Sequence, residues 1–513
     1  MDDLEQSDGG FDDTSVEPGV WRFAHATRVR VIVDADDYFE LMQRALLGAR
    51  DRALLIGWDF DTRIHLTHGR RWWQKAWKRG FPARLGSFIV WLTRRRRRLD
   101  FRILPWSFGM LKFAHRGTMM LDLIRWSFHP RIDVKFDSAH PVGCSHHQKI
   151  AVIDDALAIC GGIDMADRRW DTREHLEHDP RRHRPGGPVY GPWHDITMML
   201  EGPVAGALDD LGRDRWRRAG GKPLAPPRPH DSSAWPEGLE PHFENVEVGI
   251  ARTRAAWRDD PGVSEIEALF VAQIARAKRF IYAENQYFAS RAVAEAISAR
   301  LVEPDPPEIV IVHPTTANGW IESTAMDPAR ARLLHAIAEI DRHKRFHIYS
   351  PFSGAAPIYV HAKLLIVDDE IIRIGSANFN NRSMRLDSEC DVFTDCARPA
   401  NSHCEPIIRA MRHSLLAEHC GLDEADVADL IGSAGSMAAM IEALGTDRPR
   451  RLVPFEAEEP TALGAALADG ETFDPEDPAQ MFRILAPRRG LFRKGSLLAR
   501  AMTRLDRRKR RLK

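Results

Sequence analysis

A short pattern of polar residues occurs twice in this sequence, and the duplication restricts the fold more than any other feature. The first copy consists of His147, Lys149, Asp154 and residues 161–164 (Gly-Gly-Ile-Asp), and the second of His361, Lys363, Asp368 and residues 375–378 (Gly-Ser-Ala-Asn). Both copies fit H-x-K-x4-D-x6-G-[GS]-x-[ND] without a gap, 214 residues apart. Such a shared spacing is not expected by chance, so the sequence predicts two equivalent halves.

The residues between the fixed polar positions predict buried β-strands. Residues 150–153 (Ile-Ala-Val-Ile) and 364–367 (Leu-Leu-Ile-Val) are short, apolar and rich in β-branched side chains. Side chains two positions apart lie on the same face of a strand, so each histidine should project beside its lysine. Asp154 and Asp368 follow these strands and are interpreted as turn and scaffold residues.

Two such segments brought together would place two imidazoles and two ammonium groups around one cavity. This set of groups suits a phosphodiester, because lysines can bind the non-bridging oxygens while one histidine attacks phosphorus and the other protonates the leaving oxygen. A single histidine on a strand is more often a core residue, and only the repeated spacing favours an active site here. The sequence therefore predicts one site shared by two halves.

The order of predicted elements before each motif also repeats, which indicates that whole domains are duplicated. A chain of 513 residues is also too long for one ordinary core. We expect a disordered acidic N-terminus (1–20), a first half (21–215, motif 147–164), a linker rich in Gly and Pro (216–245), a second half (246–435, motif 361–378) and a C-terminal extension with a basic tail (436–513).

The duplicated motif resembles the signature of the phospholipase D superfamily. Further blocks are similar to lipid-cleaving members of that family: Arg-Trp-Asp-Thr at 169–172, Pro-Trp-His-Asp at 192–195 and Ile-Tyr-Ala-Glu-Asn-Gln-Tyr-Phe at 281–288. The resemblance runs from about residue 31 to about residue 391. It implies an α/β fold made of two fused, duplicated sandwich domains with the active site at their interface.

The resemblance also implies a reaction. Phosphatidylcholine-like glycerophospholipids would be hydrolysed to phosphatidic acid and a free head-group alcohol through a phosphohistidine, and transfer to a second alcohol is an open possibility. By resemblance, His147 is the nucleophile and His361 the general acid and then base, although the sequence alone does not distinguish them. An attacking neutral imidazole needs its other nitrogen held, normally by a carboxylate. We expect Asp195 and Glu389 to fill this role.

Lys149, Lys363, Asn378 and Ser376 are expected to bind phosphoryl oxygens. Asp164 occupies the position of Asn378 in the first copy, which departs from the strict pattern and weakens any phosphate role for it. No metal or cofactor is predicted, since the lysines supply the charge that Mg²⁺ would otherwise provide. Three histidines in one loop, at 175, 178 and 183, lack the regular spacing typical of metal ligands.

Charge and composition bear on partners and location. Lys plus Arg equals Asp plus Glu at 73 each, so overall charge does not favour nucleic acid. The expected partner is a phospholipid at a membrane surface, touched through the five arginines at 94–98 and the basic tail 488–513, unless these are a solvated helix end and a disordered tail. No stable protein partner is predicted.

Cysteine usage and the lack of targeting signals bear on where the protein is located. The six cysteines are scattered, which favours thiols in a reducing compartment. The first twenty residues do not resemble a signal peptide, and no apolar run reaches the ~20 residues of a spanning helix. We expect a cytoplasmic or peripheral membrane protein, with export by a signal-less route left open.

Three other functions remain open at this stage. A phosphatidyltransferase such as a cardiolipin or phosphatidylserine synthase would use the same residues with a different acceptor. A nuclease is less favoured by the neutral charge and the lipid-type blocks, although the basic tail keeps it in view. A catalytically inactive lipid-binding protein is disfavoured because both motifs are complete. Head-group preference and oligomeric state are not determined by the sequence.

Overall fold

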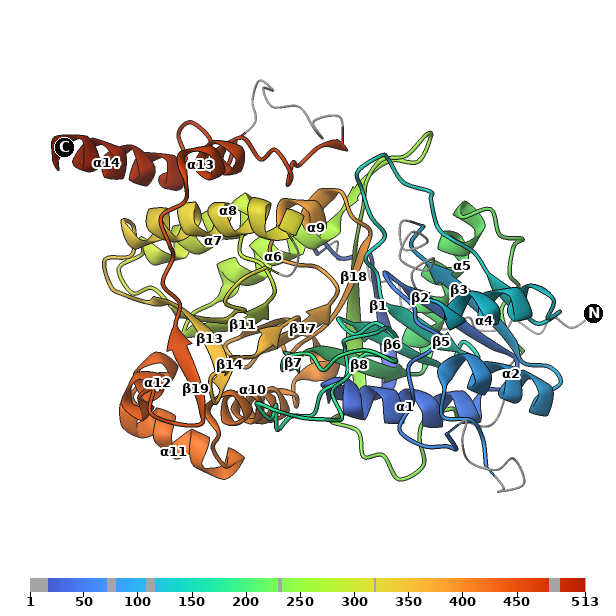
Figure 1. Ribbon diagram of the computed structural model, residues 1–513. Helices are drawn as coiled ribbons and strands as arrows, with labels where there is room; N and C mark the ends of the chain where they lie inside the picture. The colour runs from blue at the N-terminus through green and yellow to red at the C-terminus, as the bar shows by residue number, and fades with distance from the viewer. Residues whose placement is uncertain are drawn as a thin grey trace, which may run out of the picture.

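The strands of each half follow the same order, and the second half mirrors the first. The computed structural model describes residues 17–71, 80–107, 116–228, 233–317, 320–478 and 490–512. Within them the fold is mixed α/β, as predicted, with the first half (blue to green) and the second half (yellow to red) side by side (Figure 1). Residues 1–16 of the expected disordered N-terminus lie outside the described ranges.

Hydrogen-bonded strands form one continuous series through both halves. In the first half the order is β4 (Ile132–Val134), β3 (Asp100–Pro105), β2 (Arg52–Gly57), β5 (Ile150–Ile153), β6 (Leu157–Gly161), β8 (Ile196–Glu201) and β1 (Arg22–Val33). In the second half it is β9 (Phe243–Arg254), β18 (Glu389–Asp395), β17 (Ile371–Gly375), β16 (Lys363–Val367), β11 (Phe280–Asn285), β12 (Glu308–Val312) and β13 (Phe346–Ser353). The antiparallel pair β1–β9 joins the two sets, and β2–β3–β4 and β11–β12–β13 are parallel.

Four short strands make further pairings. They are β7 (Trp193–His194), β15 (Tyr359–Val360), β10 (Val263–Ser264) and β14 (Ala356–Pro357). The parallel pair β7–β15 links the two halves beside the second motif. This link places Trp193 and His194 of the first half next to the residues that precede His361.

Both motif strands are buried on both faces. Ile150 and Val152 of β5, and Ile366 of β16, belong to a central apolar cluster shared by the two halves. Their neighbours Ile153 and Val367 face outward into separate clusters under the helices. Alternation of side chains along a strand thus lets one short apolar run contribute to two cores.

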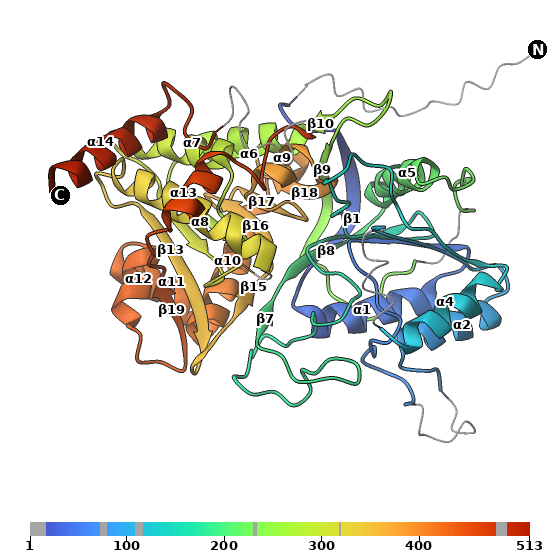
Figure 2. The same ribbon diagram turned by 45° about the horizontal axis from the view of Figure 1, so that its top comes forward.

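Helices cover the outer faces of the strands (Figure 2). Over the first half lie α1 (Ala35–Gly48), α2 (Leu85–Arg95) and α4 (Thr118–Ser127), and over the second α6 (Glu265–Arg276), α7 (Arg291–Leu301), α8 (Trp320–Ala338), α9 (Asn381–Arg385), α13 (Ala462–Asp469) and α14 (Leu497–Leu512). The central cluster is closed by α5 (Pro203–Arg218), α10 (Glu405–Cys420), α11 (Glu424–Ala434) and α12 (Met437–Leu444). A short 3₁₀ helix spans Pro399–Asn401.

Each motif aspartate opens a tight hairpin. Asp154 and Asp155 have φ of 54° and 61°, and Asp368 and Asp369 have φ of 55° and 59°. Two successive residues with positive φ are typical of the hairpin turns that match the twist of paired strands. The turns β5–β6 and β16–β17 are therefore equivalent, as the sequence predicted.

The C-terminal extension packs against the second half. Strand β19 (Arg450–Pro454) pairs with β13, and α14 buries Leu498, Ala501 and Met502 in the cluster that also holds α7 and α8 residues. A disordered tail is therefore wrong for residues 497–512, which form an amphipathic helix. Residues 488, 489 and 513 of the predicted tail lie outside the described ranges.

No helix in the described part of the chain is both long and apolar enough to cross a bilayer by itself. Together, α11 and α12 reach the required length and composition, but they are bent by 104° at their junction.

Candidate active site

The two motif histidines line one cavity between the halves. His147 precedes β5 and His361 precedes β16, so both side chains come from the ends of equivalent strands. The cavity has a volume of about 270 Å³. Its walls are formed by Trp58, Trp106, Ser145, His147, Arg169, Trp193, Gln286, Tyr287, Met326, His361, Asn378, Asn380, Arg382, Ser383, Asp387, Glu389 and Phe473.

Each histidine is held by a carboxylate from the opposite half. Nδ1 of His147 lies 3.0 and 3.1 Å from the two carboxylate oxygens of Glu389. Nδ1 of His361 lies 2.7 Å from Oδ2 of Asp195. Glu389 begins β18 of the second half, and Asp195 lies between β7 and β8 of the first. The two carboxylates expected from the sequence are thus brought to the histidines, and the pairing crosses between halves.

The tautomer of His147 follows from its third contact. Its Nδ1 also lies 3.0 Å from the backbone oxygen of Ser376. A carbonyl oxygen can only accept a hydrogen bond, so Nδ1 must carry the proton. In the neutral ring Nε2 then keeps its lone pair, which is the form required of a nucleophile.

Burial and neighbouring charge set the protonation of these groups. Burial, followed by Lys149 and Lys363, lowers the pKa of His147 well below its usual value. Burial and Lys363 do the same to the pKa of His361. Burial also raises the pKa of Glu389 to about 8 and that of Asp195 to about 7. Burial therefore disfavours a charged imidazolium beside a charged carboxylate in both histidine–carboxyl pairs. The imidazoles are neutral in the free protein.

The two lysines lie beneath the cavity rather than in its wall. Lys149 Nζ is 3.3 Å from Oδ2 of Asp164 and donates to the backbone oxygen of His147 at 2.9 Å. Lys363 Nζ donates to Oε1 of Gln286 at 3.0 Å and to the oxygen of His361. Burial, partly opposed by Asp195, lowers the pKa of Lys363 to about 7. Asp164 accordingly contacts a lysine, in line with its doubtful phosphate role.

Asn378 and Ser376 differ in what their side chains contact. Asn378 lines the cavity, and its buried Oδ1 has no hydrogen-bond partner among the described residues. Ser376 is fully buried, and its hydroxyl donates to Oε2 of Glu389 at 2.5 Å. The Ser376 hydroxyl therefore contacts the orienting carboxylate Glu389. This contact argues against the predicted role of Ser376 in binding phosphate.

The motif aspartates lie at the opposite ends of the strands from the histidines. The Asp154 carboxylate accepts hydrogen bonds from the backbone N–H groups of residues 50–52, ahead of β2. The Asp368 carboxylate accepts from those of residues 278, 279 and 280, at the start of β11. Neither lines the cavity, so their geometry matches a scaffold that ties the hairpins to neighbouring strands.

Several cavity residues were not assigned a role from the sequence, although the repeat contains a signal for some. Arg169 lies 22 residues after His147, and Ser383 lies 22 after His361; both line the cavity. Trp58 follows β2 and Gln286 follows the equivalent strand β11. Phe473 comes from the C-terminal extension, and no sequence pattern points to it.

Aromatic rings flank both histidines. The ring of Trp193 lies 5.1 Å from that of His361, and Trp58 meets His147 edge-on at 6.4 Å. The guanidinium of Arg169 lies 4.6 Å above the Trp193 ring, and its buried Nε has no hydrogen-bond partner among the described residues. One cationic group is thus held at the cavity by stacking.

The chain is similar to phospholipases D. The family model described as Phospholipase D matches residues 345–446, which include the second motif. Phospholipase D alpha 1 of Ricinus communis is 28% identical over 403 residues, covering 55% of this chain and 49% of that protein. The Arabidopsis thaliana protein of the same name is 27% identical over 408 residues, with the same coverage. The chain spans about half the length of these curated relatives.

Among solved structures, phosphatidylserine synthase of Haemophilus influenzae aligns with 77% of this chain and 95% of its own, at 13% identity and a TM-score of 0.47. The matched family model and the curated relatives thus agree that the chain is similar to phospholipases D, and the family model covers the segment that holds the second motif.

Proposed function

We propose that this protein is a phosphodiesterase that cleaves glycerophospholipids of the phosphatidylcholine type to phosphatidic acid and the free head-group alcohol. The observation that carries the proposal is the crossed geometry of the site. Two neutral imidazoles face one cavity, and each is held through Nδ1 by a buried carboxylate of the other half. This is the arrangement needed for a nucleophile and a proton donor on opposite sides of a phosphorus atom.

In the first step, Nε2 of His147 attacks phosphorus and the bond from phosphorus to the head-group oxygen breaks. His361 donates its proton to that oxygen, which leaves as the alcohol. A bound phosphodiester anion favours the protonated form of His361 that this step requires. Lys149, Lys363 and Asn378 bind the non-bridging oxygens, and Arg169 adds a further cation at the cavity wall.

In the second step, His361 takes a proton from water and the water oxygen attacks phosphorus. The bond from phosphorus to His147 breaks, phosphatidic acid is released and both rings return to their starting states. An alcohol in place of water would give a transfer product by the same proton movements.

The aromatic residues in the cavity wall favour a substrate with a quaternary ammonium head group. Trp58 stacks on Trp106 at 6.1 Å, and Trp193 and Tyr287 line the same cavity. Aromatic faces attract cations, and choline is a ligand that such cages recognise. The cavity is also of the size of a head group rather than of a whole lipid.

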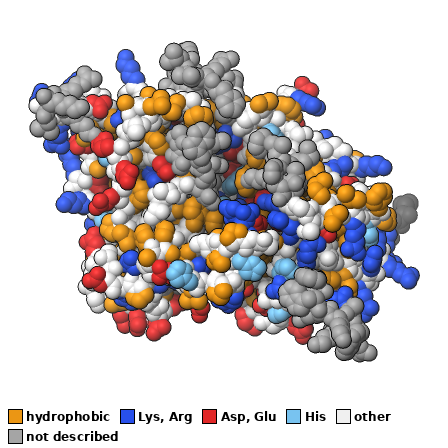
Figure 3. Space-filling view, viewed as in Figure 1, with side chains coloured by type: hydrophobic (Ala, Val, Ile, Leu, Met, Phe, Trp, Pro, Cys, Tyr) orange, Lys and Arg blue, Asp and Glu red, His pale blue; other side chains and the backbone are white. Residues whose placement is uncertain are grey.

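An apolar and basic surface supports contact with a lipid layer. Leu121, Ile124 and Phe128, on or just after α4, are 66%, 52% and 83% exposed. The exposed arginines at 94–98 lie at the end of α2 and just after it, and this end is tied to the segment after α4 because Arg131 donates to the backbone oxygens of Thr93 and Arg96. Hydrophobic and basic side chains meet over α2 and α4 at the right-hand edge in Figure 3. Apolar groups flanked by cations are typical of surfaces that bind anionic lipid interfaces.

The proposal is tested by incubating the purified protein with phosphatidylcholine in detergent micelles, with and without ethanol, and identifying the products. Phosphatidic acid is expected without ethanol, and phosphatidylethanol in addition with it. Cleavage of DNA diesters together with intact phosphatidylcholine would overturn the proposal.

A further inference from the structure

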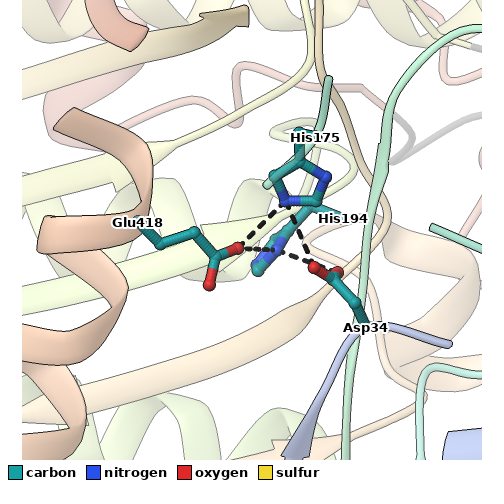
Figure 4. A group of neighbouring side chains, drawn as sticks. All are labelled: Asp34, His175, His194 and Glu418. Carbon is teal, nitrogen blue, oxygen red and sulfur yellow. Dashed lines mark hydrogen bonds and ion pairs between the residues drawn. The ribbon is translucent and has the colours of Figure 1, made fainter. Parts of the chain in front are cut away.

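A cluster of buried histidines and carboxylates lies behind the active site, at the junction of the two halves. Asp34 connects β1 to α1, His175 lies in the loop before β7, His194 ends β7, and Glu418 comes from α10 of the second half (Figure 4). All four side chains are almost completely buried, and one ligand atom from each lies within 4.8 Å of all the others.

The four side chains point towards one another (Figure 4). Nε2 of His175 is 3.0 Å from Oε1 of Glu418 and 3.2 Å from Oδ2 of Asp34. Nδ1 of His194 is 2.8 Å from the same Glu418 oxygen and 3.2 Å from Oδ1 of Asp34. Ligand atoms about 2.0–2.1 Å from a tetrahedral ion lie about 3.3 Å apart. The four nitrogen–oxygen distances therefore need to expand by only a few tenths of an ångström, and all of the ligand atoms lie within 4.8 Å of one another.

Two of these atoms lie 2.8–3.2 Å from other atoms of the cluster, but none of their contacts in the described structure has the geometry of a hydrogen bond. They are Oδ2 of Asp34 and Nδ1 of His194, in side chains that are 1% and 0% exposed. Leaving a buried polar atom without a partner costs free energy, so such atoms require an explanation. A cation at the centre of the cluster would satisfy both at once.

The outer nitrogens of both rings are already held by other carboxylates. Nδ1 of His175 is 3.0 Å from Oδ2 of Asp171, and Nε2 of His194 is 2.7 Å from Oε2 of Glu284. A proton on each outer nitrogen leaves the inner nitrogen of the neutral ring with a lone pair directed at the cluster. A carboxylate behind a histidine is the usual second layer of a metal site, where it fixes the tautomer and orientation of the ring.

From this geometry we propose that Asp34, His175, His194 and Glu418 form a structural binding site for a divalent transition-metal ion, with Zn²⁺ the best fit. Two imidazoles exclude Ca²⁺ and Mg²⁺ as preferred occupants, since these ions take oxygen ligands. Four protein ligands complete a tetrahedral shell and leave no position for a reacting group, which is typical of a structural site.

The site would stabilise the junction that supports His361. The backbone N–H of His361 donates to the oxygen of His194 at 2.7 Å, and the N–H of Asp195 donates to Oδ1 of Asp34 at 3.0 Å. The cluster thus joins α10 of the second half to the segment that presents the orienting carboxylate Asp195. The ion would act on stability and on the position of Asp195, not on the phosphate.

The test uses the full-length protein and Zn²⁺ alone. The protein is produced with Zn²⁺ in the medium, gel-filtered and analysed for metal; Zn²⁺ is then titrated into chelator-treated protein against a chromophoric competitor. One tightly bound ion per chain and a rise in Tm are expected. Substitution E418Q should weaken binding at least ~100-fold, because it removes a charged ligand. Wild-type protein without stoichiometric zinc by both measurements would overturn the proposal.

Two control variants separate this site from other zinc-binding groups. H178Q changes an exposed histidine in the same loop as His175, and H147A removes an imidazole of the active site. Both should bind zinc as the wild type does. Equal affinity in E418Q and the wild type, or loss of the ion in H147A, would contradict the assignment.

X-ray absorption of the zinc-loaded wild type does not depend on any variant folding. The proposal requires two imidazole nitrogens and oxygen ligands at about 2.0–2.2 Å. The described cysteines are free, so a sulfur shell at about 2.3 Å would place the ion on thiols instead and refute the site.

Discussion

The carboxylate of Glu389, in the second half of the chain, lies 3.0 Å from Nδ1 of His147 in the first half. The reciprocal contact joins Asp195 of the first half to His361 of the second. Each half therefore supplies one imidazole and the support for the other. If both contacts are required, neither half by itself contains a working site.

Removing the charge of either orienting carboxylate should slow catalysis while leaving the fold intact. E389Q and D195N are expected to lower kcat by at least ~10²-fold with little change in KM. A neutral side-chain amide holds the protonated Nδ1 of the imidazole less strongly than a carboxylate does. The matched control is E237Q at an exposed position. Steady-state kinetics and Tm check this, and full activity in E389Q would disprove the orienting role.

The two histidines should fail at different steps. H147A is expected to lose at least ~10³-fold in turnover, because no covalent intermediate can form. H361A should still form the phosphohistidine with a substrate whose leaving group needs no protonation, since only the second step then lacks its base. Mass spectrometry after rapid quenching detects the adduct. An adduct in H147A but not in H361A would reverse the assigned roles.

The pH dependence of kcat/KM should be bell-shaped. The orienting carboxyls Asp195 and Glu389, with pKa raised by burial to about 7 and about 8, become ionised as pH rises, which favours catalysis. Lys363, with its pKa lowered by burial to about 7, loses its charge over the same rise, which opposes phosphate binding. K363R keeps its charge, so its descending limb should move to higher pH. If the descending limb of K363R stays at the wild-type pH, the limb belongs to a group other than Lys363.

The exposed apolar side chains after and on α4 should contribute to binding of lipid surfaces. Replacing Leu121 and Phe128 by serine is expected to weaken binding to anionic vesicles ~10-fold or more, since each side chain buries apolar area in the lipid. Turnover of a soluble short-chain substrate should not change. L463S, which alters a 71% exposed leucine on α13, is the control. Equal binding of vesicles by the Leu121/Phe128 variant and by L463S in a sedimentation assay would exclude this surface as a lipid contact.

The motif aspartates should matter for stability and not for chemistry. D368A removes the acceptor of three backbone N–H groups, so a loss of ~2–4 kcal/mol in the free energy of unfolding is expected. At a temperature where the variant stays folded, kcat should fall less than tenfold, in contrast to H361A. Denaturant unfolding and kinetics on one preparation decide between the two roles.

Local pattern was sufficient to predict the elements around each motif. The strands β5 and β16, their burial on both faces and the aspartate turns all follow from interactions between near neighbours, such as side-chain alternation and positive φ at Asp154 and Asp368. The basic C-terminus was harder, because the choice between a solvated tail and α14 depends on whether Leu498 and Met502 find a surface to cover. That surface is built by distant residues of α7 and α8.

The sequence by itself was sufficient to predict two equivalent halves and to propose which histidines, lysines and carboxylates bear on the chemistry, because spacing along a strand is a local property. Only the tertiary structure decided that each carboxylate contacts the histidine of the other half, that Phe473 lines the cavity, and that His175 and His194 meet Glu418. These contacts join residues far apart in the chain. They arise when the two halves pack around a shared core, and no periodicity within either segment records that packing.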